Sequence, residues 1–259
     1  MEPNLINAKR LSGRISIVTG GGNGIGEATA WRLSQEGAAV AVADFNEEAA
    51  KRVCQRLTDA GGDAISVFTN VLNSDSILKL TSEVTKRWGR IDILINSAGG
   101  FDQFLPITDI SDEEWDKVVE LNLRSTFSCC RAVIPIMTKQ HYGRIINIAS
   151  QAGVAPSPNA PSYLPYAAAK AGVIGFTKLL ARDVGQFGIT VNAISPGTTA
   201  TERVVRIRGP ETLQNMASLN PMRKLVEPED SAATAAFLAS DDARLITGTN
   251  INVNAGTVM

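Results

Sequence analysis

The stretch Thr19-Gly20-Gly21-Gly22-Asn23-Gly24-Ile25-Gly26 directly follows an apolar run at 15–18 and precedes a helical pattern over 27–35. Glycine lets the backbone approach a pyrophosphate closely, and the following helix offers unpaired N–H groups and the positive end of its dipole. Alone, such a turn can equally be a tight connection between a strand and a helix. Its place after a strand and before a helix favours a dinucleotide-binding turn.

Asp44 adds a second constraint on the same site. It ends the next apolar run, 39–43, and lies 18 residues after Gly26. An acid at the carboxyl end of the second strand can accept hydrogen bonds from the ribose hydroxyls of NAD, and it repels the 2′-phosphate of NADP. The alternative interpretation is an ordinary turn residue at a strand end. We expect NAD as the cofactor.

Strand and helix patterns alternate along the rest of the chain. Further strands are predicted at 64–69, 91–95, 144–148, 190–194 and 250–253, and helices at 47–60, 74–88, 111–139, 166–186 and 227–240. Ser74 is the expected N-cap of its helix. Short apolar strands between helices are typical of a parallel sheet that is covered on both faces. We expect one α/β domain over 1–259, doubly wound around a seven-stranded parallel sheet, with an N-terminal extension over 1–10. A βα barrel is the competing architecture, but it has no use for the glycine-rich turn or for Asp44.

Length and composition exclude several classes of protein. The chain has 259 residues and a net charge of -1, so it has no global basic field for nucleic acid. It has no run of 18 apolar residues and no apolar core of a secretory signal, so we expect a cytoplasmic protein without membrane contact. One His (His141) and three Cys, two of them adjacent (Cys129 and Cys130), make neither a zinc site nor a disulfide framework. We expect no metal.

Tyr166 and Lys170 stand four residues apart on a predicted helix and therefore share one of its faces. The reference pKa of Tyr is about 10, and a nearby ammonium favours the phenolate and lowers that pKa. Ser150 follows the strand at 144–148, and ligands of an open α/β sheet bind outside the carboxyl ends of its strands. We expect Ser150 to face the same cleft as the glycine-rich turn.

A set of short motifs occurs in a fixed order from about residue 11 to residue 256. The motifs are the segment 19–26, Asp44, Asn96-Ser-Ala-Gly99, Asn122, Ser150, Tyr166-Ala-Ala-Ala-Lys170, Pro196-Gly197 continuing to Thr201, and Ile246-Thr-Gly followed by Ile251-Asn-Val253. Each motif is weak alone, but the ordered set is highly specific. On these motifs the chain resembles the short-chain dehydrogenase/reductase family, which has a Rossmann-type fold.

The resemblance implies a catalytic role for four residues. Tyr166 is implied to be the general acid/base that exchanges a proton with the substrate oxygen. Lys170 is implied to lower the pKa of that tyrosine and to bind the nicotinamide ribose, and Ser150 to hold the reacting oxygen by a hydrogen bond. Asn122 is implied to hold a local distortion of the long helix and a water that continues the proton relay.

The resemblance also implies which residues surround the ligands. Cofactor contacts are implied for Gly20, Asn23, Gly24, Ile25, Gly26, Asp44, Asn70, Val71, Asn96, Ala98, Gly99, Tyr166, Lys170, Pro196, Gly197, Thr199 and Thr201. Residues from about 198 to 226 are expected to form a substrate lid, and the candidates for substrate contact are Gln151, Tyr163, Arg203 and Arg206.

The lid carries three arginines within six residues. On a helix, Arg203 and Arg206 would share a face, and Arg208 would point elsewhere. The planar fork of an arginine suits a carboxylate or phosphate of the substrate. The alternative is that all three are solvated or pair with Glu202 and Glu211.

Three features depart from the family pattern. Asn70 stands where the family often has Asp, and Ser97 where it usually has Asn. The segment between Ser150 and Tyr166 is longer than usual and holds Pro156, Pro158, Pro161 and Pro165. Proline restricts the backbone of this segment. The resemblance implies that the segment borders the substrate, so we expect a substrate pocket that is individual to this chain.

We expect an NAD-dependent oxidoreductase that interconverts a secondary alcohol and a ketone of a small-molecule substrate by hydride transfer. An NADPH-dependent 3-oxoacyl-acyl-carrier-protein reductase is the alternative enzyme, which Asp44 and Phe45 disfavour. A non-catalytic dinucleotide-binding protein is an alternative of another class, and the presence of all four catalytic residues argues against it. The sequence does not identify the substrate.

A homotetramer is the expected assembly, because the helices at 111–139 and 166–186 usually pack against partner copies in the family. Both helices carry more apolar residues than one face needs. These residues are Val118, Val119, Leu121, Phe127, Val133, Ile134, Ile136, Val173, Ile174 and Phe176.

Overall fold

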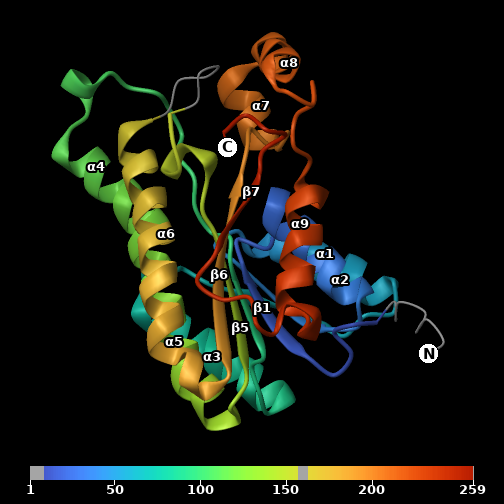
Figure 1. The fold of residues 1–259 in the computed structure, drawn as a ribbon. Coiled ribbons are helices and arrows are strands. Elements are labelled where there is room, and N and C mark those ends of the chain that lie inside the picture. Colours follow the sequence, from blue (N-terminus) through green and yellow to red (C-terminus); the bar gives the residue numbers. More distant parts are fainter. Residues whose placement is uncertain (1–8, 157–162, 259) are drawn as a thin grey trace.

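The computed structural model of this chain describes residues 9–156 and 163–258, and within them it forms the expected doubly wound α/β fold (Figure 1). The seven strands are parallel and lie in the order β3-β2-β1-β4-β5-β6-β7. Their bounds are β1 Ile15–Thr19, β2 Ala39–Asp44, β3 Ala64–Phe68, β4 Ile93–Asn96, β5 Gly143–Ile148, β6 Ile189–Pro196 and β7 Asn250–Val253. The sheet is open, with β3 and β7 at its edges, so the barrel alternative is wrong. Most of the predicted N-terminal extension, and Pro158 and Pro161, lie outside the described residues.

Helices cover both faces of the sheet (Figure 1). One face carries α1 (Gly24–Gln35), α2 (Glu47–Asp59) and α9 (Pro228–Ala239), and the other carries α3 (Ser74–Trp88), α5 (Ser125–Gln140) and α6 (Leu164–Val184). The helix α4 (Asp112–Val119) precedes α5, and the helices α7 (Glu202–Arg208) and α8 (Pro210–Leu219) lie between β6 and α9. The strand order reverses between β1 and β4, and this is where a doubly wound fold binds its ligands.

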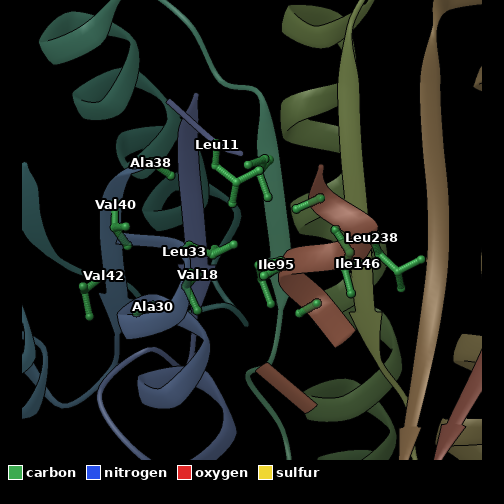
Figure 2. Close-up of a cluster of buried hydrophobic side chains, with 14 of the residues drawn as sticks. Leu11, Val18, Ala30, Leu33, Ala38, Val40, Val42, Ile95, Ile146 and Leu238 are labelled. Carbon is green, nitrogen blue, oxygen red and sulfur yellow. The ribbon is translucent and has the colours of Figure 1, made fainter. Parts of the chain in front are cut away.

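The core consists of two apolar layers, one on each face of the sheet. In the layer under α1 and α9, Val18 and Ile146 point from the strands toward Leu33 and Leu238 of the helices (Figure 2). All four side chains are fully buried. Successive residues of a strand point to opposite faces, so strands that are buried on both sides must be apolar throughout. This explains why the strand segments could be recognised as continuous apolar runs.

Several predicted boundaries are wrong in detail. Asn73, not Ser74, caps α3, because its side chain accepts a hydrogen bond from the Ser76 N–H at 2.9 Å. The helix predicted over 111–139 is interrupted by a π-helical turn at Glu120–Arg124. The helices α7 and α8 were not predicted as such, and Gly209 between them has φ +76°.

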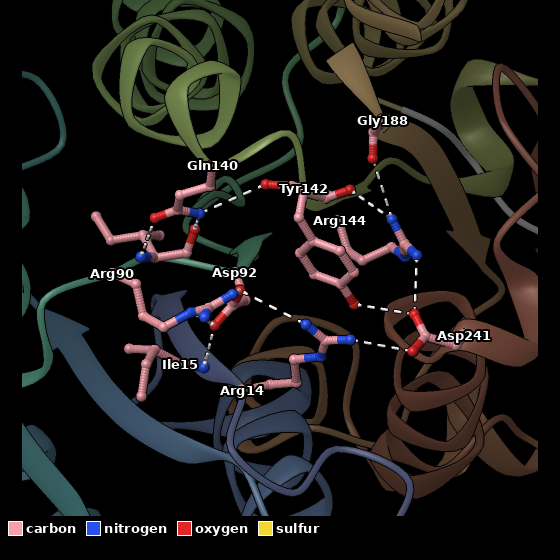
Figure 3. A network of polar contacts seen from close by, with 11 residues as sticks. Arg14, Ile15, Arg90, Asp92, Gln140, Tyr142, Arg144, Gly188 and Asp241 are labelled. Carbon is pink, nitrogen blue, oxygen red and sulfur yellow. Dashed lines mark hydrogen bonds and ion pairs between the residues drawn. The ribbon is translucent and has the colours of Figure 1, made fainter. Parts of the chain in front are cut away.

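Charged side chains tie the strands together at their amino ends, away from the reversal point (Figure 3). Asp92, which is fully buried, accepts hydrogen bonds from the Ile15 N–H at 2.9 Å and from Arg90 Nε at 2.8 Å. Asp241 pairs with Arg14 and with Arg144, at 3.0 Å each. This network joins the starts of β1, β4 and β5 to the turn after α9, and it leaves the carboxyl ends of the strands for ligands.

No helix in the described part of the chain is long and apolar enough to span a membrane.

Candidate active site

A cleft of about 990 Å³ runs along the carboxyl ends of the strands, from the glycine-rich turn to Tyr166 and the segment 198–208. All but three of the residues proposed from the sequence line it. The exceptions are Gly26, Asn96 and Asn122, which lie behind its wall. The fold therefore brings together residues that are more than 180 positions apart in the sequence.

The glycine-rich turn has the geometry that a phosphate cradle needs. Gly20 has φ +65°, and a Cβ there would lie 2.8 Å from Cα of Ala98. A Cβ on Gly26 would collide with the carbonyl oxygen of Gly20, so this residue allows α1 to begin close under the turn. The start of α1 therefore faces the cleft with its N–H groups, and the cradle fits the pyrophosphate of a dinucleotide.

Asp44 lies at the far end of this half of the cleft. Its Oδ2 accepts a hydrogen bond from the Gly22 N–H at 2.9 Å, and its Oδ1 accepts one from the Asn46 N–H at 2.8 Å. Phe45 is 68% exposed and packs on Phe68, with ring centroids 5.6 Å apart. A fixed carboxylate beside an exposed aromatic ring fits the ribose and the adenine of a dinucleotide.

Asn70 and Val71 continue this wall of the cleft. The side-chain oxygen of Asn70 accepts a hydrogen bond from the Leu72 N–H at 3.0 Å. A carbonyl oxygen has a second lone pair, so Asn70 can still accept from an adenine amine.

Asn96 is buried behind the cleft, where its Nδ2 donates to Oδ1 of Asn147 on the adjacent strand at 2.8 Å. Asn96 thus joins β4 to β5, and it does not line the cleft. Ala98 and Gly99, which follow the strand, do line the cleft. The substitution at Ser97 leaves the backbone held, since its N–H donates to the Thr19 hydroxyl at 3.2 Å.

Asn122 lies at the centre of the π-helical turn, so the expected distortion of the long helix is present. Its Oδ1 accepts from the Gly100 N–H and its Nδ2 donates to the Gly100 carbonyl, both at 2.8 Å. The same Nδ2 donates to the Val118 carbonyl at 2.8 Å. Asn122 therefore positions the loop after β4 from behind the cleft.

Ser150, Tyr166 and Lys170 meet at the other end of the cleft. The Lys170 Nζ donates to the Ile148 carbonyl at 2.7 Å and lies 5.6 Å from the ring centroid of Tyr166. Burial lowers the pKa of Lys170 to about 8. Lys170 is consequently protonated at neutral pH but loses its proton more readily than a lysine in water.

The pKa of Tyr166 differs from the expectation. Burial raises it above its ordinary value, and the hydrogen bond with Ser150 and the positive charge of Arg203 oppose that rise in part. The expectation that the pKa of Tyr166 lies below its ordinary value is thus wrong, because burial outweighs the groups that favour the phenolate. The Tyr-x-x-x-Lys spacing identifies a neighbouring ammonium, but it does not report how far the hydroxyl is removed from water.

Aromatic rings form the substrate end of the cleft. Phe101 packs on Tyr163 and on Tyr166, with centroids 5.4 and 4.9 Å apart, and on Phe104 at 5.0 Å. The Tyr163 hydroxyl donates to Glu114 at 3.2 Å, so its ring faces the cleft while its polar end is already bound. Of the two phenylalanines, only Phe101 lines the cleft, and sequence patterns do not predict its place because the loop at 97–106 has no regular period.

Gln151 also lines this end, and it is only 8% exposed. Among the residues that the structure describes, its Oε1 is buried without a hydrogen-bond partner. A buried acceptor without a donor is costly, so a donor on a ligand would be bound favourably here.

All three arginines of α7 line the cleft, so the expectation that Arg208 points elsewhere is wrong. The helix lies across the cleft, and more than one of its faces borders the cavity. Arg203 donates to the Gly99 carbonyl at 2.6 Å, Arg206 is exposed, and the guanidinium of Arg208 lies 4.7 Å from the ring centroid of Phe104. Burial lowers the pKa of Arg208.

The segment that carries these arginines leaves and rejoins the body of the protein at one place. Thr199 and Val226 form a parallel bridge, and the Ala200 N–H donates to the Val226 carbonyl at 3.0 Å. Thr201 caps α7, because its hydroxyl accepts from the Val204 N–H at 3.3 Å. Pro196, Gly197, Thr199 and Thr201 line the cleft beside this bridge.

Comparisons with known proteins agree with this geometry. A family model described as "Enoyl-(Acyl carrier protein) reductase" matches residues 20–258. A 3-oxoacyl-[acyl-carrier-protein] reductase of Synechocystis sp. is 40% identical over 251 residues, which are 96% of this chain and 98% of the relative. A protein of the same name from Haemophilus influenzae is 40% identical over 246 residues, which are 95% of this chain and 98% of the relative.

A solved structure of levodione reductase superimposes with a TM-score of 0.90 at 31% identity, covering 95% of this chain and 98% of that protein. Matches of this extent cover the glycine-rich turn, the catalytic tyrosine and lysine, and the whole sheet. The chain belongs to the short-chain dehydrogenase/reductase family.

Proposed function

We propose that this chain interconverts a secondary alcohol and a ketone with NAD(H), and that Tyr166 is its general acid/base. The observation that carries the proposal is that one continuous cleft joins the glycine-rich turn and Asp44 to Ser150, Tyr166 and Lys170. A bound nicotinamide cofactor supplies hydride to the ketone or accepts it from the alcohol. The chain has to hold the reactants in place and to move the proton.

The Tyr166 hydroxyl gives its proton to the ketone oxygen during reduction and takes it back during oxidation. The Ser150 hydroxyl holds the same oxygen by a hydrogen bond. Lys170 places a positive charge next to Tyr166 at neutral pH, which favours the deprotonated form of the tyrosine. Asn122 acts indirectly, by holding Gly100 through both its N–H and its carbonyl.

The preference for NAD(H) rests on Asp44. Its carboxylate is held at the end of β2 by two backbone N–H groups. In that orientation it can accept from the ribose hydroxyls, and it opposes a 2′-phosphate. The experiment that tests the proposal is a panel of ketones and alcohols, followed by NADH absorbance with the wild-type protein. Turnover of no member, with bound NADH, would favour a non-catalytic dinucleotide-binding protein instead.

A second candidate function is the reduction of 3-oxoacyl groups on an acyl carrier protein with NADPH. The two relatives at 40% identity are named for that reaction, and they support this candidate better than an unspecified secondary alcohol. Asp44 and the exposed Phe45 argue against its cofactor. Acetoacetyl thioesters of acyl carrier protein and of coenzyme A, each with NADH and NADPH, separate the two candidates. Turnover restricted to carrier-protein thioesters with NADPH would replace the first proposal by the second.

The substrate end supports a ligand with a flat apolar body and an anionic group. The rings of Phe101 and Tyr163 offer an apolar wall, with Phe104 packed against Phe101, and the three arginines of α7 offer positive charge. Arg203 and Arg206 were the candidates from the sequence. Arg208 joins them, because its half-buried guanidinium lies over one of these rings.

A homotetramer remains our proposal for the assembly. Val118, Val133 and Val173 are buried within one chain, so they do not support it. Phe127 on α5 is 43% exposed and Leu179 on α6 is 67% exposed, and both are apolar. These two helices therefore offer an apolar surface to a second copy.

A further inference from the structure

Gln151 has an unused polar side chain at the substrate end of the cleft. The residue follows Ser150 directly, lines the cleft and is only 8% exposed. Within the described residues, neither end of its carboxamide makes a hydrogen bond, and its Oε1 is buried. A buried acceptor without a partner costs free energy. The carboxamide therefore lacks a partner that a ligand in the cleft can supply.

The backbone of Gln151 is held in place, so its side chain starts from a fixed position. The Gln151 carbonyl accepts from the Val154 N–H at 2.9 Å, and the 3-10 turn Gln151–Gly153 packs on α6. A Cβ on Gly153 would lie 2.5 Å from the backbone nitrogen of Ala171, so the turn and the helix are in close contact. The carboxamide is thereby positioned relative to the helix that carries the proposed base.

The unpaired oxygen lies between the ends of β5 and β6. A Cβ on Gly197 would lie 3.2 Å from Oε1 of Gln151, and both Gly197 and Ser150 line the cleft. The last torsion of a glutamine side chain is broad, so the amide can turn toward a ligand. Because consecutive Cα atoms are about 3.8 Å apart, a ligand whose oxygen is held by Ser150 brings its neighbouring atoms within reach of Gln151.

The chemistry of the carboxamide determines which neighbouring group fits. Oε1 accepts hydrogen bonds and Nε2 donates them, and a hydroxyl group can pair with either. The thioester beside the oxo group of a 3-oxoacyl substrate offers only acceptors, so it would leave Oε1 unpaired. A plain aliphatic carbon would leave both ends of the carboxamide unpaired. A hydroxyl group beside the reacting carbon is thus the best match for Gln151.

We propose that Gln151 selects a substrate with a hydroxyl group on the carbon next to the reacting carbon, so that the chain interconverts a vicinal diol and a hydroxyketone. In oxidation, hydride leaves the reacting carbon for NAD and the proton of its hydroxyl goes to Tyr166. The neighbouring hydroxyl keeps its bonds and donates to Oε1 of Gln151. The inference rests on the proposed function, because it takes that reaction as given and adds the class of substrate.

The test compares two ketones that differ in the neighbouring group, 2-hydroxycyclohexanone and 2-methoxycyclohexanone, because the methoxy group keeps the oxygen but has no donor. The wild type should have a kcat/KM with NADH that is about tenfold to a hundredfold higher for the hydroxyketone. In Gln151→Leu, which has a side chain of similar size, most of this preference should be lost. Since both proteins are given the same two ketones, the change in the ratio reports the hydrogen bond and not the bulk of the methoxy group.

Two further variants sharpen the comparison. Gln151→Glu keeps an acceptor and should retain part of the preference for the hydroxyketone. Gln186→Leu makes the same exchange at an exposed residue that does not line the cleft, and it should keep the wild-type ratio. Circular dichroism of each variant verifies that it is folded.

Equal ratios in the wild type and Gln151→Leu would overturn the inference and leave the proposed function in place. Loss of NADH affinity in Gln151→Leu by fluorescence titration, with an unchanged ratio, would overturn it as well, because the amide would then hold the cofactor. A higher wild-type kcat/KM for acetoacetyl thioesters than for the hydroxyketone would also refute the proposed substrate class. If the wild type reduces no ketone at all, the proposed function fails and this inference fails with it.

Discussion

The Lys170 ammonium donates a 2.7 Å hydrogen bond to the carbonyl oxygen of Ile148. Ile148 ends β5 two residues before Ser150, and Lys170 stands one helical turn after Tyr166 on α6. This bond therefore fixes the distance between the helix that carries the proposed base and the strand that carries the proposed hydroxyl donor. Because burial lowers the pKa of Lys170 to about 8, the charge of this lysine changes with pH near that value.

The first prediction concerns the proposed base. Tyr166→Phe should lower kcat for ketone reduction about 10²- to 10⁴-fold, because it removes the group that transfers the proton. Tyr163→Phe is the matched control, since the hydroxyl it loses is bound to Glu114. The steady-state rates of both variants are measured by NADH absorbance. Turnover near the wild-type level in Tyr166→Phe would refute the assignment.

The second prediction concerns cofactor choice. The wild type should have a higher kcat/KM with NADH than with NADPH, and Asp44→Ala should narrow that ratio about tenfold or more, through the loss of a charged acceptor for the ribose. Initial rates with both cofactors at one substrate concentration series give the ratio. Equal kcat/KM values for the two cofactors in the wild type would contradict the role of Asp44.

The third prediction concerns the stability of the ligand-free protein. The pKa of Lys170 is about 8 in the folded protein, against about 10.5 in the unfolded chain. Below pH 8 both states hold the proton, and the folded state bears the full cost of burying the charge. Between these values the unfolded chain binds more protons, so stability rises with pH by roughly 3 kcal/mol in total from this group.

Lys170→Met removes this titration and leaves the others in place. The melting temperature of the wild type should therefore rise relative to that of Lys170→Met as the pH goes from 7 to 10. Thermal unfolding by circular dichroism at one protein concentration gives the difference. A difference that stays constant over this range would show that Lys170 titrates as in water.

The fourth prediction concerns the arginines of α7. If one of them binds an anionic group of the substrate, its change to Ala should lower kcat/KM for a carboxylate-bearing ketone about tenfold or more relative to the methyl ester of the same ketone. Arg203→Ala, Arg206→Ala and Arg208→Ala are compared on the same pair. Unchanged discrimination in all three variants would mean that the arginines are surface charge or hold the segment itself.

The fifth prediction concerns assembly. Sedimentation at micromolar concentration should give the mass of a tetramer, and Leu179→Glu on the exposed face of α6 should give a smaller species. Leu78→Glu is the control, because Leu78 is 57% exposed on α3, outside the proposed surface. A monomeric wild type would rule the tetramer out.

The parts of the fold that could be predicted are those where backbone chemistry restricts the residue. Only glycine fits at Gly20 and Gly26, and strands buried on both faces must be apolar, so the turn, the sheet and its parallel direction follow from local patterns. The cap of α3 illustrates the limit of such patterns. Asn73 and Ser74 are both good caps, and the tertiary path of the chain decides between them.

Other features depend on contacts that a sequence pattern does not contain. Arg52 looks like one more charge on the exposed face of α2, and only the fold brings it to Gly22. The raised pKa of Tyr166 follows from its burial, which the spacing to Lys170 does not encode. The helices α7 and α8 bury few residues, so their apolar period is weak.

The bridge between Thr199 and Val226 closes the stretch of chain that holds α7 and α8. The chain between these two residues leaves and rejoins the sheet at this bridge, contacts the C-terminal segment through Asn220 and Met222, and carries all three arginines of the cleft. The cost of closing a loop changes slowly with its length, so insertions and exchanges in this stretch put little strain on the sheet. A change in the stretch after Thr201 therefore alters one wall of the cleft while the strands that end at Asp44 and before Ser150 keep their positions.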